Sequence, residues 1–154
     1  MEEDQLLMQQ LKLLIAQLSS DLSAIALLDP NNRIRWKYIS GNSNDRYRHM
    51  VKKPGFGLAG QIIRYGRTII IDRMHPNTEI LNGQYPLMLS ERLQSVIAMP
   101  LYLDSRIFGV LLVGDRRERI YSLLDVQYVE EAREHIISVI PSELIHHSLL
   151  RKNP

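Results

Sequence analysis

The stretch SVIAMPLYLDSRIFGVLLVG, residues 95–114 of this 154-residue chain, is the part of the sequence that decides the fold. Two apolar runs, 95–103 and 106–114, flank the polar residues Asp104 and Ser105. Apolar runs of this length that are bounded by turn residues are typical of buried β-strands. The spacing therefore predicts a hairpin at the centre of a β-sheet.

A second hairpin is predicted upstream of the first. Residues 23–28 are apolar and end at the turn sequence Asp-Pro-Asn-Asn, after which residues 33–39 alternate between polar and apolar types. This alternation is typical of a half-buried strand, and it predicts that Ile34, Trp36 and Tyr38 share its apolar face. Two hairpins of this kind predict an antiparallel sheet.

Both ends of the chain have the pattern of amphipathic helices. The N-terminal helix is predicted over 2–21, where leucines recur at spacings of four and three. The C-terminal helix is predicted over 122–150, with Ser122 and Asp125 in the spacing of a capping box and a kink near Pro141. Together the two apolar stripes exceed what one sheet face covers, so a homodimer through the terminal helices is expected.

The order of these elements predicts a single α+β domain over residues 1–154. Its antiparallel sheet is expected to carry the N- and C-terminal helices packed together on one face and a ligand pocket on the other. The segment between the hairpins is irregular, with short helices predicted at 45–51, 58–65 and 84–94 and a brief strand at 68–71.

Composition and charge exclude several classes of protein. The chain contains no cysteine, which excludes disulfides, thiolate metal sites and thiol nucleophiles. Its 19 basic residues nearly balance its 17 acidic ones, so nucleic-acid binding through bulk charge is not expected. No apolar run approaches the roughly 20 residues that cross a bilayer, and the acidic start differs from a secretory signal. A cytoplasmic protein that does not bind membranes is therefore expected.

Catalytic and metal-binding patterns are weak in this sequence. There is no Gly-x-Ser-x-Gly nucleophile motif, and three of the five histidines are scattered. The other two, His146 and His147, are adjacent and would therefore point to different sides of the predicted helix. No metal site and no enzymatic activity are therefore predicted. The mixed charges of residues 115–119 are expected to form a solvated loop, with docking of an acidic partner surface as the alternative.

The most informative motif is GFGLAGQ at residues 55–61. Glycines let the backbone turn tightly, and the helix that follows begins with N–H groups that lack an intrahelical partner and carry positive partial charge. Such a helix start can hold an anion without any cationic side chain. The alternative is a plain turn, since the motif is neither a Walker loop nor a dinucleotide fingerprint.

Two aromatic residues are candidates to complete such a site. Trp36, the one tryptophan in the chain, is either a core residue or a ligand contact, because a buried indole N–H needs an acceptor. Tyr85 precedes Pro86 in the loop expected over the pocket. It is either a second hydroxyl donor or an exposed loop residue.

Four stretches of the chain resemble the GAF domain family. They are GLAGQII at 57–63, RTIIID at 67–72, SVIAMPL at 95–101 and IFGVLLV at 107–113. The resemblance extends over nearly the whole chain, and it implies an antiparallel sheet with a pocket roofed by the irregular middle segment. Bilin-binding members and free methionine sulfoxide reductases of this family depend on cysteines, which this chain lacks.

Within that family the chain resembles the NreA-type nitrate receptors, which work with an NreB-type sensor histidine kinase. The resemblance implies a pocket without a cofactor that binds nitrate mainly through backbone N–H groups. The residues it implies are the helix-start pair Leu58 and Ala59, the tryptophan Trp36, and the lid residues Tyr85 and Leu87.

Nitrate suits a pocket of this kind, because it is monovalent and its oxygens only accept hydrogen bonds. The sequence therefore predicts a nitrate-responsive regulator of a two-component system that controls nitrate or nitrite respiration. One alternative is an interaction or dimerisation module that binds another small ligand or none. The other is an enzyme, which would need acid–base residues that the motif lacks.

Overall fold

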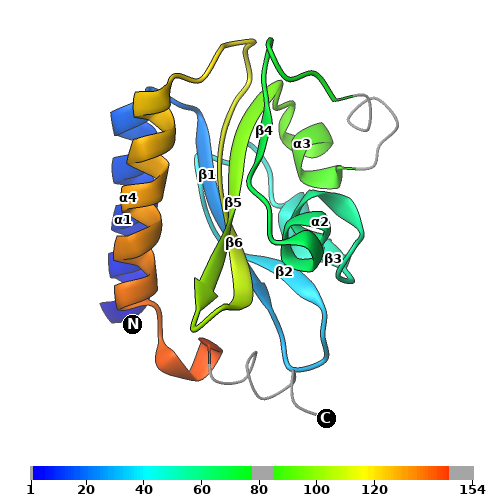
Figure 1. Ribbon diagram of the computed structural model, residues 1–154, viewed down its shortest axis with the longest axis vertical. Helices are drawn as coiled ribbons and strands as arrows, with labels where there is room; N and C mark the ends of the chain where they lie inside the picture. Colours follow the sequence, from blue (N-terminus) through cyan, green and yellow to red (C-terminus); the bar gives the residue numbers. More distant parts are fainter. Residues whose placement is uncertain (1, 78–84, 146–154) are drawn as a thin grey trace.

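The computed structural model describes residues 2–77 and 85–145 and contains a six-stranded antiparallel sheet. The strand order is β3-β2-β1-β6-β5-β4, with β1 at Leu22–Leu28, β2 at Ile34–Ser40, β3 at Val51–Lys52, β4 at Ile69–Ile71, β5 at Ser95–Leu103 and β6 at Arg106–Asp115. The long helices α1 (Glu2–Leu18) and α4 (Leu123–Val139) lie side by side on one face of the sheet, and the short helices lie on the other (Figure 1). The predicted α+β class and the packing of the terminal helices are confirmed.

The predicted central hairpin is formed by β5 and β6, which pair along their whole length. On its other side β6 pairs with β1, so the two predicted hairpins meet in the middle of the sheet. Nearly every residue of these three strands is buried. Because helices and irregular chain cover both faces of the sheet, the side chains on both faces of these strands are shielded from water. This explains why the strands are continuous apolar runs and do not alternate with polar residues.

Strand β2 contains a bulge that corrects one sequence prediction. Ile25 of β1 pairs with Tyr38, whereas the next residue, Ala26, pairs with Trp36, so Lys37 is the extra residue. A bulge shifts the alternation of side chains. Trp36 therefore packs on the face opposite the long helices, while Tyr38 lies on the helix side and donates a 2.8 Å hydrogen bond to Asp4. The prediction that both aromatics share one face was wrong.

Helix α1 ends at Leu18, short of the predicted end at residue 21. Ser19 adopts a left-handed backbone conformation with φ of 52°, which turns the chain toward the start of β1 at Leu22. The predicted leucine stripe is buried against the sheet and α4; its members are Leu7, Leu11, Leu14 and Leu18.

Helix α4 begins as predicted, with a capping box in which the Ser122 hydroxyl accepts from the Asp125 amide and the Asp125 carboxylate accepts from the Ser122 amide. Its regular part stops at Val139, just before Pro141 removes a backbone donor, and residues 142–145 are again helical. The remainder of the predicted 122–150 helix lies outside the described residues. No helix in the described part of the chain is long and apolar enough to cross a membrane.

The charged segment 115–119 is only in part the solvated loop that its sequence predicts, because Arg117 and Glu118 are exposed whereas its other residues are not. Asp115 is fully buried, and its Oδ2 accepts hydrogen bonds from the hydroxyls of Ser20 and Tyr121 at 3.0 and 2.9 Å. Arg119 forms a 3.2 Å ion pair with the same oxygen and also binds Asp125 at 3.2 Å. The end of α1, the end of β6 and the start of α4 are thereby joined, and this arrangement balances the buried charge.

Candidate functional site

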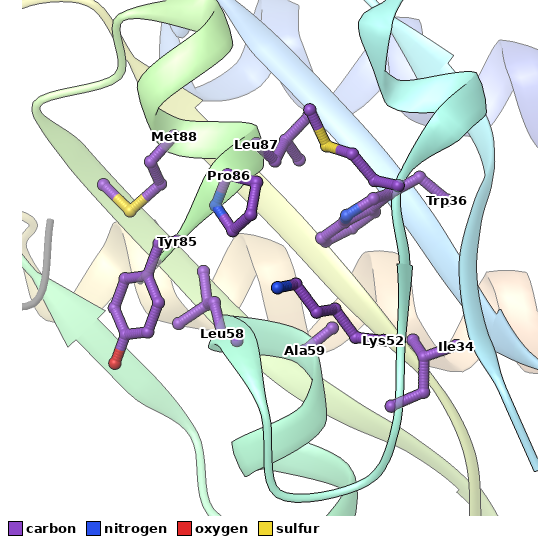
Figure 2. Close-up of a pocket in the computed structure, with 11 residues that line it drawn as sticks. Ile34, Trp36, Lys52, Leu58, Ala59, Tyr85, Pro86, Leu87 and Met88 are labelled. Carbon is purple, nitrogen blue, oxygen red and sulfur yellow. The ribbon is translucent and has the colours of Figure 1, made fainter. Parts of the chain in front are cut away.

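A cavity lies on the face of the sheet opposite α1 and α4. The cavity is small, with a volume of about 30 Å³, and its walls come from β2, β3 and the starts of the helices α2 (Gly57–Tyr65) and α3 (Pro86–Glu91). Its lining is mostly apolar and consists of Ile34, Trp36, Met50, Lys52, Gly57, Leu58, Ala59, Tyr85, Pro86, Leu87 and Met88 (Figure 2). All five residues that the sequence analysis named as ligand contacts therefore lie around one cavity.

The start of α2 forms one wall of this cavity. The residue before the helix, Phe56, provides no side-chain cap, and Gly57 has a left-handed φ of 71° that any side chain would strain. First-turn amides of a helix have no intrahelical acceptor. The amides of Leu58 and Ala59 are therefore uncapped donors in residues that are nearly buried. The predicted geometry of a turn followed by a helix start is present.

Gly60 is what lets this turn lie so close to the helix. A Cβ at Gly60 would lie 2.7 Å from the carbonyl oxygen of Lys53 and 3.2 Å from the amide nitrogen of Gly55. The turn is also tied to the helix by a 2.7 Å hydrogen bond from the Gly55 amide to the Gly60 carbonyl. The glycines at 55, 57 and 60 thus each serve the same compact turn, which explains their spacing.

Trp36 and Leu87 line the cavity from opposite elements. Trp36 is half-buried on the cavity face of β2, and Leu87 is buried in the first turn of α3. Helix α3 therefore brings part of the predicted lid against the sheet. These positions are compatible with ligand contact through the indole from one side and an aliphatic wall from the other.

Tyr85 is only 1% exposed, which excludes the exposed loop tyrosine that the sequence left open. Its phenol ring extends past Leu58 and away from Trp36 (Figure 2). The hydroxyl donates to Gln61 Oε1 at 3.3 Å and accepts from Asn77 at 3.4 Å. Tyr85 therefore contributes its ring to the cavity lining, while its hydroxyl is bonded to α2 and does not point between Trp36 and Leu58.

Lys52 is a lining residue that the sequence analysis missed. Its side chain is half-buried, and its ammonium group extends into the space between Trp36, Pro86 and Leu58 (Figure 2). A helix start can hold an anion without a cationic side chain, but this cavity contains one in its lining. Lys52 lies in a polar stretch of sequence without periodicity, so no local pattern predicts which way its side chain points. Its pairing with Ile34 in the sheet places the two side chains on the same face, toward the cavity.

The far end of α3 is held by a buried carboxylate that the sequence analysis also missed. Glu91 is fully buried, forms a 2.6 Å ion pair with Arg116, and accepts hydrogen bonds from the amide and hydroxyl of Ser43 at 2.7 and 2.9 Å. Burial raises the pKa of Glu91, but these donors outweigh burial and the pKa is lowered overall. The ionised carboxylate therefore fixes the helix that carries Pro86 and Leu87.

The described lining of the cavity contains no carboxylate and no histidine. Across residues 2–77 and 85–145, no group of three or more histidine, aspartate or glutamate side chains is placed to hold a metal ion. The closest contact between such groups, Asp72 with His75 at 2.8 Å, lies outside the cavity lining. What the cavity offers chemically is an apolar wall, uncapped amides and one ammonium group.

Comparison with known families and structures gives consistent matches. A family model described as "GAF domain" matches residues 1–140. The chain is similar to NreA of Staphylococcus aureus mutated in its nitrate-binding site, with 31% identity and a TM-score of 0.69 over 79% of this chain and 92% of that one. It is also similar to a hypothetical protein from S. aureus, with 33% identity and a TM-score of 0.66 over 73% of this chain and 94% of that one.

A more distant likeness concerns the fold alone. The free methionine-R-sulfoxide reductase of Neisseria meningitidis, solved with its substrate, is 18% identical, with a TM-score of 0.68 over 94% of this chain and 78% of that one. No curated protein matches the sequence. The arrangement of sheet and helices is thus shared with proteins of different activity, and the residues of the cavity must carry any functional argument.

Proposed function

Because this chain belongs to the GAF domain family, we propose that it is a small-ligand sensor whose cavity binds nitrate. The observation that carries the proposal is the uncapped start of α2, whose first-turn residues Leu58 and Ala59 line a mostly apolar cavity. The chain is also similar to NreA proteins whose descriptions name a nitrate-binding site, and this similarity supports nitrate as the ligand.

The chemistry of the cavity favours a small monovalent anion. Nitrate oxygens accept hydrogen bonds and donate none, which matches a wall that presents N–H donors. Charge-assisted hydrogen bonds contribute roughly 1.5–3 kcal/mol each, so a few such bonds can hold a small anion after the costs of binding. The flat indole of Trp36 and the side chain of Leu87 would cover the faces of the ligand.

We further propose that the protein is a cytoplasmic regulator and not an enzyme. In this proposal it responds to nitrate and modulates an NreB-type sensor histidine kinase of a two-component system that controls nitrate or nitrite respiration. A ligand can shift the surface offered to a kinase only if it binds two conformations with different affinity. The helix α3 is the natural element to move, because it contributes Pro86 and Leu87 to the cavity.

Isothermal titration calorimetry on the ligand-free protein tests the ligand. Nitrate should release heat with a saturable isotherm, whereas chloride and phosphate should bind much more weakly. Trp36→Ala should weaken nitrate binding by at least tenfold. Tyr38→Phe is the matched control on the same strand, because Tyr38 lies on the other face of the sheet and its variant should bind as the wild type does. No heat with nitrate would reject the proposal.

The alternative, a dimerisation module, is favoured by one observation on α1. Leu6 and Leu13 are 41% and 53% exposed, and their spacing of seven residues places them on one side of the helix. Sedimentation velocity over a range of concentrations tests this role. A dimer that dissociates in Leu6→Glu or Leu13→Glu variants, with no nitrate binding in the wild type, would favour the alternative.

A further inference from the structure

We propose that the Lys52 ammonium group supplies the counter-charge for the anion bound in the cavity. The inference rests on the proposed nitrate function and adds a residue to it. It is drawn from three observations on Lys52: its position on β3, the path of its side chain, and the absence of a partner among the described residues.

Strand β3 positions the lysine at the mouth of the cavity. Lys52 pairs with Ile34 of β2, and both side chains line the cavity. Residues directly opposite each other in an antiparallel pair lie on the same side of the sheet. The side chain of Lys52 is half-buried, and its ammonium group points inward toward Trp36, Pro86 and Leu58 (Figure 2).

The path of the side chain is set by Gly57. A Cβ at Gly57 would lie 3.4 Å from Cγ of Lys52 and 3.7 Å from both Cδ and Cε. The methylene chain therefore passes beside the first residue of α2, through space that a side chain at position 57 would reach. This packing brings the ammonium group to the same end of α2 as the uncapped amides of Leu58 and Ala59.

The ammonium group has no counter-charge within the described residues. The cavity lining there contains no carboxylate, and no described residue forms an ion pair or hydrogen bond with the ammonium group of Lys52. The contrast with Arg116 and Arg119 is clear, since both form ion pairs with buried carboxylates. A helix N-terminus carries about half a positive charge, so two positive groups share one apolar cavity.

A bound anion would supply the missing counter-charge of the ammonium group and the helix start. A dianion such as sulfate costs far more to desolvate than a monovalent ion, so the apolar walls of the cavity disfavour it. Lys52 therefore attracts the anion, while the walls formed by Trp36, Leu87 and their neighbours select by desolvation cost, size and shape.

Calorimetry on the full chain with three variants tests this role. Lys52→Met keeps a flexible chain of similar length without the charge, Lys52→Arg keeps the charge, and Lys53→Met removes a charge from the exposed neighbour. Lys52→Met should weaken nitrate binding by about tenfold or more, because a charge-assisted contact is lost. Lys52→Arg should stay within about threefold of the wild type, and Lys53→Met should be unchanged.

Two further readouts separate charge from structure. The nitrate affinity of the wild type should fall as the ionic strength rises from roughly 20 to 500 mM, with sodium sulfate as the added salt. The nitrate affinity of Lys52→Met should depend less on ionic strength. Without nitrate, the melting temperature of Lys52→Met should equal or exceed that of the wild type, because the repulsion with the helix start is removed. A merely structural lysine would give a lower melting temperature.

The outcomes distinguish the two proposals. If wild-type protein binds nitrate and Lys52→Met binds equally well with the same ionic-strength dependence, the role of Lys52 is overturned and the nitrate proposal stands. If the wild type releases no heat with nitrate, both proposals fall. If Lys52→Met gains affinity for sulfate relative to nitrate, the counter-charge role of Lys52 is overturned, because loss of a positive charge should weaken the binding of a dianion more than that of a monovalent ion.

Discussion

The two faces of the sheet are covered in different ways. The helix face is closed by α1 and α4, whose buried stripes pack into one continuous core with the side chains of the sheet. The cavity face is covered by the short helices α2 and α3 and by irregular chain (Figure 1). The cavity lies on this face. Long helices close a sheet face completely, whereas short segments that meet at their ends leave space and expose backbone donors.

Because of this difference, we expect the two faces of the sheet to contribute unequally to stability and to ligand binding. Side chains on the helix face should contribute to the free energy of unfolding without affecting a ligand. Residues on the cavity face should affect the ligand at a smaller cost in stability. The segment 115–119 joins the two faces, because Arg116 binds Glu91 of α3 while Arg119 binds Asp125 of α4. The following variants test how far this division holds, from the largest expected effect to the smallest.

Leu11→Ala should give the largest loss of stability. Leu11 is fully buried in the helix-face core, and truncation of such a leucine costs about 2–5 kcal/mol. Leu13→Ala on the exposed side of α1 is the matched control and should change the free energy of unfolding by less than about 0.5 kcal/mol at dilute protein concentration. Urea unfolding measures both. If Leu11→Ala also weakened nitrate binding as strongly as Trp36→Ala does, the two faces would not be separable.

Glu91→Gln should affect both faces, because it removes the charge that holds α3 to β6. We expect a loss of about 2–3 kcal/mol at pH 7, since the donors of Ser43 and Arg116 lose an ionised and buried acceptor. Nitrate binding should also weaken, because α3 carries Leu87. Glu118→Gln is the matched control; its side chain is 67% exposed, and its stability should change by less than about 0.5 kcal/mol.

The stabilisation from Glu91 should depend on pH with a known sign. The pKa of Glu91 is lowered from its ordinary value of 4.5, so the unfolded chain takes up a proton at a higher pH than the folded protein does. The stability difference between wild type and Glu91→Gln should therefore be constant above pH 4.5 and shrink as the pH falls through the lowered pKa. A difference that grows on acidification would contradict the ionised state of this carboxylate.

Gly60→Ala should open the turn next to the cavity. The new Cβ would meet the Lys53 carbonyl at 2.7 Å, so the turn must move away from α2. We expect a cost of about 1–2 kcal/mol, because crowding outweighs the better helix propensity of alanine. Gly66→Ala, which strains the left-handed cap at the other end of the same helix, is the control. Both should lower the melting temperature, but only Gly60→Ala should weaken nitrate binding in calorimetry.

Ser122→Ala should have the smallest effect of the set. It removes the hydroxyl that caps α4, and loss of such a cap costs about 1 kcal/mol. Nitrate affinity should not change, because the cap lies on the helix face. Ser138→Ala is the control, since that exposed hydroxyl binds only the carbonyl of His135 in its own helix. Equal melting temperatures for the two variants would show that the capping box contributes nothing measurable.

Much of the site could be predicted from sequence because its main features are local. The turn and helix start at residues 55–61 depend on glycine spacing, and they place Leu58 and Ala59 without reference to any distant residue. Trp36 follows from strand alternation, although the bulge reverses the face of Tyr38. A bulge changes hydrogen-bond register between two strands, and neither strand's own pattern records it.

Sequence alone determined the elements whose causes lie within one segment. The apolar runs of the central hairpin, the leucine stripe of α1 and the capping box of α4 each follow from local periodicity or from side chains within one turn. Only the tertiary structure decided the partners of charged residues. Asp115 accepts a hydrogen bond from Ser20, which lies 95 positions earlier in the chain. Glu91 forms an ion pair with Arg116, and Lys52 lines the cavity. The cost of burying a charge depends on what surrounds it in space, and a linear pattern does not contain that information.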